Sequence, residues 1–496
     1  MHVLFDARLL HRPLSGLERV QRNLLRELAA NPSITRLRVV VMHGTKLPAE
    51  FPKRAEPVFV HGTEDILREL TGKEAPDVYH LSWFPDRNPR DLWLPLVAKS
   101  SVVEVHDAIL NRHPEYHPNH DCWKWYSSFV TRLVRNADRL LVHSRSVADE
   151  VKDDIGGDPS ICDLAPLAVE PTLRTPLTAE AARARRDRLG IPSRYFLAVG
   201  KDYPHKGHNT MFRALARLDD DIPIVCAGSQ VWNGPDNTQK EIAELGIRDR
   251  VRWIEGLDDE DVKALIQGAS ALLYPSTEEG FGLPPIEAMA LGTPVIAASA
   301  MSIPEVCKDG AWLFPAGDSK ELSKLMHKAL TDQEAVAQLV AKGREVEAGY
   351  SWTRCAELTI ACYRKAIDES AKPEALRKRP KLAPAAVESL LVQAKAPFST
   401  ERELAAWQER CLSVENTLRE LRVRLDQLQA APSPTAVTAA STQQAQQPVE
   451  PPPPPPPLPL APMDESRPSQ PQRPKFSIKR RIQKIRAGLA RWTNRF

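Results

Sequence analysis

Short apolar, β-branched runs alternate with amphipathic stretches over the first two-thirds of the chain. Because helices join parallel strands and cover their sheet, this alternation predicts an α/β protein. A polar, Arg-rich segment near residues 173–190 separates two series of runs. The first series comprises residues 3–6, 37–42, 77–80, 102–105 and 140–143, and the second comprises YFLAVG, IPIVCAG, VRWIEG, ALLYPS and PVIAAS. We therefore predict two Rossmann-like domains that face a cleft, with ligands held at the carboxyl ends of the strands.

The pattern changes beyond about residue 370. Residues 371–399 are rich in Pro, Ala and basic side chains, which predicts a linker. Residues 400–430 predict a coiled coil, because apolar side chains recur there at spacings of three and four: Leu404, Trp407, Cys411, Val414, Leu418, Leu421, Leu425 and Leu428. We predict self-association into a homo-oligomer through this helix. The alternative is one amphipathic helix that docks on the preceding domains.

The last 66 residues divide into two further parts. Residues 431–475 are rich in proline and include the run 451–457, which predicts a disordered, extended linker because such a stretch cannot form a packed core. Residues 476–496 combine an apolar stripe with basic side chains and contain no acidic residue. This pattern predicts a basic amphipathic helix on an anionic membrane surface. The alternative is a basic tail that docks on a protein or on nucleic acid.

Charge and cysteine content narrow the function classes. The net charge is only +3, so the chain as a whole gives no case for a nucleic-acid partner. The seven cysteines are scattered, without a CxxC pair or metal-ligand spacing, and are expected to be reduced thiols. The opening MHVLFDARLL lacks the regions of a signal peptide, and no apolar run reaches the ~18 residues of a membrane span. These features predict a cytoplasmic location.

The most specific segment is STEEGFGLPPIEAMALGTPV, residues 276–295. It predicts a strand end, a glycine-rich turn and a helix that begins near Pro284, where proline is tolerated. Such a turn directs backbone N–H groups and the positive end of a helix dipole toward the ligand, which suits a diphosphate. Glu279 precedes the turn and Glu287 lies about one turn into the helix. One carboxylate can therefore lie near a sugar while the other reaches a nucleoside.

Seven residues separate Glu279 from Glu287, and EAMALGTPV completes the segment. In this context the pair resembles the EX7E signature of retaining glycosyltransferases with the GT-B fold, the family four or group 1 transferases. The resemblance covers roughly residues 1–365 and includes YSWTRCAELTIACYRKA, which is similar to the family's last helix. It implies an N-terminal acceptor domain, a nucleotide-sugar domain and a helix that crosses back to the first domain, over residues 1–172, 173–345 and 346–370.

The resemblance also implies roles for the residues of this segment. Glu287 would hydrogen-bond the ribose hydroxyls of the donor, and Glu279 would contact the transferred sugar. Backbone contacts to sugar and phosphate would come from Phe281, Gly282 and Leu283. The alternative for Glu287 is a carboxylate that only stabilises the amino end of its helix.

Two lysines in AVGKDYPHKGH resemble the family's pair of cations for the leaving diphosphate. They are Lys201, directly after VG, and Lys206, before a glycine. The first position is usually Arg in the family, so a point charge replaces a bidentate phosphate clamp at Lys201. The alternative for both is a solvated loop lysine.

In the first domain the loop RPLSGLER leads into a helix, and Gly16 would permit close approach of phosphate or acceptor. The family more often has two glycines here. His106 in VEVHDAIL resembles the active-site histidine of the family's HD pair and would contact the donor sugar. A purely structural histidine is the alternative. Ser144 matches a recurring serine of the family.

The predicted chemistry uses no cofactor and no metal. No DxD pair stands at a strand end, and cationic side chains with a helix amino end can stabilise a departing diphosphate. We predict front-face transfer with retention, with His106, Glu279 and Lys206 as the catalytic residues. The absence of GxGxxG after a strand and of GxxxxGK[ST] disfavours nicotinamide enzymes and ATPases.

The predicted partners are a nucleotide-sugar donor and a glycan or lipid-linked acceptor. The stretch NRHPEYHPNHDCWKWY is expected on the acceptor side. A place in bacterial cell-surface polysaccharide or lipopolysaccharide synthesis, at the inner face of the cytoplasmic membrane, follows from the family and the basic tail together. Two alternatives are a nucleotide-sugar epimerase or hydrolase on the same fold and a catalytically silent membrane-associated scaffold.

Overall fold

The computed structural model describes residues 1–11, 16–82, 88–230, 238–372 and 381–382. Within them lie two parallel β-sheets, and we call each sheet with its helices the first lobe and the second lobe. The first sheet has the order β3-β2-β1-β4-β5-β6-β7, with strands β1 (His2–Asp6), β2 (Arg36–Met42), β3 (Ala55–Val60), β4 (Val78–Leu81), β5 (Ser101–Val105), β6 (Arg139–Val142) and β7 (Cys162–Leu164). The second has the order β10-β9-β8-β11-β12-β13, with strands β8 (Phe196–Val199), β9 (Ile224–Ala227), β10 (Val251–Ile254), β11 (Ala271–Tyr274), β12 (Val295–Ser299) and β13 (Trp312–Pro315).

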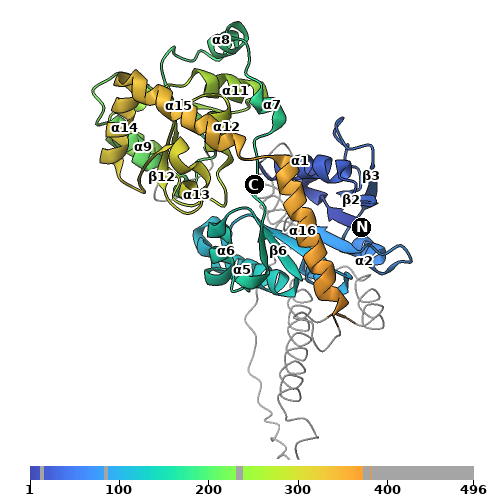
Figure 1. Cartoon of the computed structure of the whole chain (residues 1–496). Helices are drawn as coiled ribbons and strands as arrows, with labels where there is room; N and C mark the ends of the chain where they lie inside the picture. The colour runs from blue at the N-terminus through green and yellow to red at the C-terminus, as the bar shows by residue number, and fades with distance from the viewer. Residues whose placement is uncertain (12–15, 83–87, 231–237, 373–380, 383–496) are drawn as a thin grey trace, which may run out of the picture. The chain divides into compact units, whose positions relative to one another are not determined.

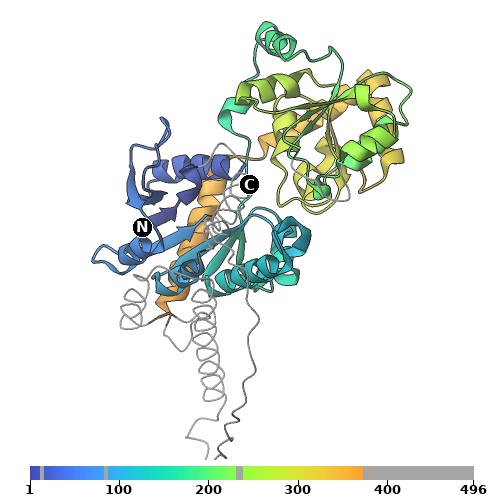
Figure 2. The same cartoon turned by 180° about the vertical axis from the view of Figure 1, so that it is seen from behind.

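Helices alternate with these strands along the chain, as Figures 1 and 2 show for both lobes. The helices of the first lobe are α1 (Gly16–Ala30), α2 (Thr63–Thr71), α3 (Leu94–Val97), α4 (Ile109–Arg112), α5 (His120–Asn136) and α6 (Arg145–Asp153). The later helices are α7 (Pro171–Arg174), α8 (Ala179–Arg188), α9 (His208–Leu215), α10 (Thr238–Glu244), α11 (Asp259–Gly268), α12 (Leu283–Ala290), α13 (Ile303–Cys307), α14 (Ser319–Thr331), α15 (Gln333–Ala348) and α16 (Trp352–Ala371).

Each sheet is buried on both faces, because successive side chains of a strand point to opposite sides. In β8, Leu197 packs into the core that contains α11 and α12, whereas Phe196 and Ala198 pack into the core that contains α9 and α14. In β5, Val102 and Val103 divide in the same way between two cores. This packing explains why the strands are continuous apolar runs in the sequence.

The predicted α/β class with two parallel sheets is confirmed, and every predicted strand run is found. Three edge strands were missed: β3, β7 and β13. β3 has the sequence AEPVFV and β7 has only three residues, so neither forms a long apolar run. In both sheets the first strand of the lobe lies inside the sheet and the strand order reverses beside it. In folds of this kind ligands bind at the carboxyl ends of the strands at such a point.

Helix α16 packs against the first lobe, where Figure 1 shows it in orange. Ser351 caps its amino end by accepting from Arg354 N, and its Tyr363 is fully buried against His80 of β4. No helix among the described residues is both long and apolar enough to cross a membrane. The predicted coiled coil (400–430), proline-rich linker (431–475) and basic amphipathic helix (476–496) lie outside the described residues, as does most of the predicted linker 371–399.

Candidate functional site

The connection between β11 and α12 forms the centre of the candidate site. β11 ends at Tyr274 and α12 begins at Leu283, so residues 275–282 lie at the carboxyl end of the second sheet. Gly282 is the N-cap of α12 and has no side chain to accept from the first backbone N–H groups. Pro284 and Pro285 carry no N–H, so the backbone N–H of Leu283 and the positive end of the helix dipole are what suit an anionic ligand here. Pro284 and Pro285 occupy the first turn, as the sequence predicted.

Glu279 and Lys206 form an ion pair in this connection. Lys206 Nζ lies 2.6 Å from Glu279 Oε1. Burial raises the pKa of a carboxyl, but Lys206 and His205 offset this effect, so the pKa of Glu279 lies below its ordinary value. The second lobe thus holds a buried, charged carboxylate next to the amino end of α12.

Gly207 explains how Lys206 reaches this position. Lys206 ends the 3-10 helix Pro204–Lys206 that follows β8, and Gly207 takes a left-handed φ of +67° between it and α9. A Cβ at Gly207 would lie 2.2 Å from the carbonyl oxygen of Pro275, directly after β11. Only glycine therefore allows the loop after β8 to pack on the connection that carries Glu279.

Glu287 is the fifth residue of α12 and is also buried. Burial raises its pKa to about 7, although Arg19 acts in the opposite direction; Glu170 and Asp259 raise it further. Arg19 of α1 lies 3.6 Å from Glu287 Oε1 and also pairs with Asp259 and Glu170. Sequence reasoning missed Arg19, although it lies in the RPLSGLER loop only three residues after Gly16.

His106 meets the same connection through its backbone. A Cβ at Gly280 would lie 1.7 Å from the His106 carbonyl oxygen, so the two segments pack as closely as backbones can. Ser144 Oγ donates to the Gly280 carbonyl at 2.7 Å. The His106 side chain lies among Glu104 and His143, and burial lowers its pKa to about 4. The structure therefore brings His106, Ser144, Glu279 and Lys206 to one place.

The other predicted site residues are described by their burial and packing. Phe281 is buried and its ring meets Tyr350 edge-on at 5.6 Å, while Leu283 is half-buried at the start of α12. Lys201 follows β8 and is half-buried, and burial lowers its pKa. Gly16 begins α1, and no atom of the residues that the structure describes lies within 4 Å of a Cβ built there. Packing against this described part of the chain therefore does not require glycine at position 16.

Three residues of the predicted acceptor loop contact the second lobe. Arg112 Nε and His113 Nε2 lie 3.0 and 2.8 Å from the carboxylate of Glu278. Tyr116 Oη lies 2.9 Å from His205 Nδ1. These contacts were not foreseen, because no short motif links the loop to Glu278 or His205.

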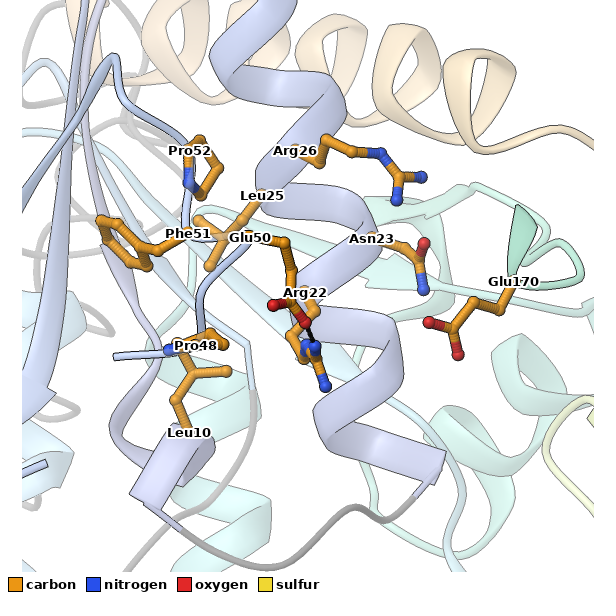
Figure 3. A pocket seen from close by; sticks show the side chains of 10 residues that line it. All are labelled: Leu10, Arg22, Asn23, Leu25, Arg26, Pro48, Glu50, Phe51, Pro52 and Glu170. Carbon is orange, nitrogen blue, oxygen red and sulfur yellow. Dashed lines mark ion pairs between the residues drawn. The ribbon is translucent and has the colours of Figure 1, made fainter. Parts of the chain in front are cut away.

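Figure 3 shows a pocket beside α1 in the first lobe. It is lined by Leu10, Arg22, Asn23, Leu25, Arg26, Pro48, Glu50, Phe51, Pro52 and Glu170. Arg22 and Glu50 form an ion pair within it, and Glu170 on the other side lies 3.8 Å from Arg19. Because Arg19 also contacts Glu287, a single side chain separates this pocket from the Glu287 carboxylate.

Among the described residues, Glu104, His106 and His143 form the one group whose spacing would also suit a metal ion, with candidate atoms within 4.8 Å of one another. His143 Nε2 lies 2.8 Å from Glu104 Oε1, the distance of a hydrogen bond. This hydrogen bond joins two of the three side chains directly.

Comparisons with known proteins agree with this geometry. The sequence profile of the family described as glycosyl transferases group 1 matches residues 183–346, which include Lys201, Lys206, Glu279 and Glu287. The MMP α-(1→4)-mannosyltransferase of Mycolicibacterium hassiacum is 35% identical over 252 residues, 49% of this chain and 58% of that protein. The serotype-specific mannosyltransferase WbdA of Escherichia coli is 26% identical over 61% of this chain and 38% of its own length.

The fold is shared with solved structures. HepE of Anabaena in complex with UDP-glucose superposes with a TM-score of 0.58 at 18% identity, covering 72% of this chain and 98% of that one. At this identity the match speaks for the two-sheet GT-B fold alone. The chain spans only part of the length of the curated relatives named above. The segment that carries the Glu279–Lys206 pair and Glu287 lies within the residues that match the family of glycosyl transferases group 1.

Proposed function

We propose that this chain is a retaining glycosyltransferase that moves a hexosyl group from a nucleotide-diphosphate sugar to a glycan or lipid-linked acceptor. The observation that carries the proposal is the partly buried Glu279–Lys206 pair beside the uncapped amino end of α12, with Glu287 one turn further along the helix. Two relatives named as mannosyltransferases support the same chemistry.

In the proposed mechanism Glu287 binds the ribose hydroxyls, and the amino end of α12 binds the diphosphate. The bond between the anomeric carbon and the diphosphate oxygen breaks while the acceptor oxygen bonds to the same face of the sugar. The acceptor proton passes to the departing diphosphate oxygen. Lys206 and the helix dipole stabilise the charge that develops on that group, so no metal is required. Glu279 and His106 contact the sugar, and Lys201 adds a second positive charge.

Calorimetric titration with UDP, GDP and ADP in the presence of chelator tests the donor site. We expect one nucleotide to bind the wild type and to bind Glu287→Ala at least about ten-fold more weakly, since a hydrogen bond to a charged group contributes roughly 1.5–3 kcal/mol. Glu321→Ala is a matched control, because Glu321 is an exposed carboxylate of α14 in the same lobe. Binding of no nucleotide would contradict the proposal and favour a silent scaffold. Release of product without acceptor would favour the epimerase or hydrolase.

We also propose that residues 476–496 bind the anionic inner face of the cytoplasmic membrane and that residues 400–430 mediate self-association. Both proposals rest on the sequence pattern alone. Removal of residues 476–496 should abolish sedimentation with anionic liposomes. A truncation before residue 400 should convert the protein to a monomer in analytical ultracentrifugation. If the truncated protein keeps the same number of subunits as the full chain, residues 400–430 do not mediate self-association.

A further inference from the structure

Four buried polar side chains meet at the carboxyl ends of three adjacent strands of the first lobe. His80 lies in β4, Glu104 in β5, His106 just after β5 and His143 just after β6. His80, Glu104 and His143 are at most 1% exposed, and His106 is 8% exposed. Glu104 Oε1 lies 2.8 Å from His143 Nε2 and 3.7 Å from His106 Nε2, and Glu104 Oε2 lies 3.4 Å from His80 Nε2. The proposed mechanism uses only His106.

The hydrogen-bond partners of His143 determine how many protons its ring carries. Its Nδ1 lies 2.8 Å from the carbonyl oxygen of Ala165, which can only accept. Its Nε2 faces the carboxylate of Glu104, which also accepts when it is ionised. Both ring nitrogens must therefore donate, so His143 is an imidazolium if Glu104 carries its charge.

The charge of Glu104 requires such a partner. A buried carboxylate is stable only when an opposite charge and hydrogen bonds compensate for the loss of water. Within the described residues, every ion-pair partner of Glu104 is a histidine: His80, His106 and His143. Burial raises the pKa of the Glu104 carboxyl, yet these histidines hold it well below its ordinary value.

The remaining groups around the cluster come from α16. Tyr363 Oη lies 2.6 Å from His80 Nδ1, so the phenol and the imidazole satisfy each other. The Cys355 thiol donates to the same Ala165 carbonyl that accepts from His143, at 3.8 Å. Burial raises the pKa of both Tyr363 and Cys355, so neither supplies the negative charge that His143 needs.

We propose that Glu104 and His143 form a buried ion pair whose role is to position His106 in the transfer site, an inference that rests on the proposed glycosyl transfer. His106 Nε2 donates to the Ser82 carbonyl at 3.2 Å, and its ring lies 4.9 Å from the His143 ring. The His106 carbonyl packs on Gly280, one residue after Glu279. A shift of His106 therefore moves the turn that holds the Glu279–Lys206 pair. Glu104 and His143 are positioning residues, since they act through His106.

The ion pair can be measured without any transfer assay, by ¹⁵N cross-polarisation spectra of the full-length protein labelled at histidine. At pH 8 an imidazole of ordinary pKa, about 6.5, is only ~3% protonated, so exposed histidines contribute almost no imidazolium signal. We expect one imidazolium to persist in the wild type and to disappear in Glu104→Gln. Carboxylates also raise the pKa of His113, so the signal must survive in the control His113→Gln.

The positioning role is tested by kinetics of the same Glu104→Gln variant, in which the amide keeps the size of the side chain and loses its charge. We expect kcat to fall about ten-fold or more, as for loss of one positioned group in a transfer site. The nucleotide Kd should stay within about two-fold, because Glu287, which binds the ribose in the proposed mechanism, lies one turn into α12 and beyond the turn that His106 contacts. A variant that is merely less well folded would lose nucleotide binding as well.

Three results would overturn the inference: a neutral His143 in the wild type at pH 8, an unchanged kcat in Glu104→Gln, or stoichiometric bound metal in the purified protein. His143→Gln serves as the second variant if Glu104→Gln does not fold, with the same expected loss of kcat. An imidazolium signal in a wild type that transfers no sugar would leave the ion pair intact and refute the proposed function instead. The two failures are therefore distinguishable.

Discussion

Glu279 and Glu287 belong to one segment and are almost equally buried, at 9% and 6% exposure, yet their pKa values move in opposite directions. The pKa of Glu279 lies below its ordinary value, whereas that of Glu287 rises to about 7. Burial raises the pKa of both carboxyls. The difference must therefore come from the charged groups around each carboxylate.

The partners of the two carboxylates differ in distance and in how they are shared. Lys206 Nζ lies 2.6 Å from Glu279, and Gly207 fixes the loop that carries it. Arg19 lies 3.6 Å from Glu287 and also serves Asp259 and Glu170, two carboxylates that further raise the pKa of Glu287. A dedicated lysine thus keeps Glu279 ionised, while a shared arginine leaves Glu287 close to its titration point at neutral pH.

The largest effect is expected for Glu279→Gln, which removes the charge that holds Lys206. We expect kcat to fall by roughly 100-fold or more, the usual range for loss of one group that stabilises a transition state. Steady-state kinetics with the donor identified by calorimetry measures this loss.

Glu321→Gln is the matched control for that substitution. Glu321 also pairs with a lysine at 2.6 Å, through Lys324 on the same helix, but this pair is exposed and lies outside the candidate site. The kcat of Glu321→Gln should equal that of the wild type. Equal activity of Glu279→Gln and Glu321→Gln would show that the Glu279–Lys206 pair has only a structural role.

A smaller effect is expected for Glu287→Gln, and it depends on pH. Because the folded-state pKa is raised, the fold binds the proton more tightly than the unfolded chain does. Glu287 therefore destabilises the fold progressively as pH rises from its ordinary pKa of 4.5 to about 7. The variant should gain up to ~3 kcal/mol over the wild type above pH 7 and almost nothing below pH 4.5. Thermal unfolding at pH 5 and pH 8 measures the difference.

An exposed carboxylate again provides the control, since Glu321→Gln should show no stabilisation that grows with pH. A Glu287→Gln difference that is the same at pH 5 and pH 8 would contradict the raised pKa. If Glu287→Gln is more stable than the wild type but binds nucleotide poorly, Glu287 serves nucleotide binding at a cost to stability.

The sequence alone predicted the features that depend on residues close together in the chain. Glycine, proline and two carboxylates at fixed spacing predicted the turn and α12, and continuous apolar runs predicted the buried strands. Lys206 was found because it directly precedes Gly207, the glycine on which the loop geometry depends.

The sequence was not sufficient where residues distant in the chain meet. Arg19 reaches Glu287 across 268 positions, and His113 reaches Glu278 across 165, without any motif that pairs them. The direction of each pKa shift depends on such contacts and on burial, which spacing alone does not specify. Strands β3 and β7 were missed for a related reason, because each lies at an end of the first sheet, where a strand does not need a long apolar run.

The smallest effect is expected for Arg19→Gln, which removes the shared cation from Glu287. Loss of Arg19 raises the pKa of Glu287 further, so more of the carboxyl is protonated at pH 7 and accepts hydrogen bonds from ribose less well. Nucleotide affinity should fall a few-fold at pH 7, since partly exposed ion pairs contribute ~1 kcal/mol or less, and should recover at pH 8.5. The control is Arg26→Gln on the same helix, because the Arg26 guanidinium pairs with Glu27. This variant should leave the nucleotide affinity unchanged at pH 7 and at pH 8.5. Tighter binding by Arg19→Gln at both pH values would mean instead that Arg19 competes with the ribose for Glu287.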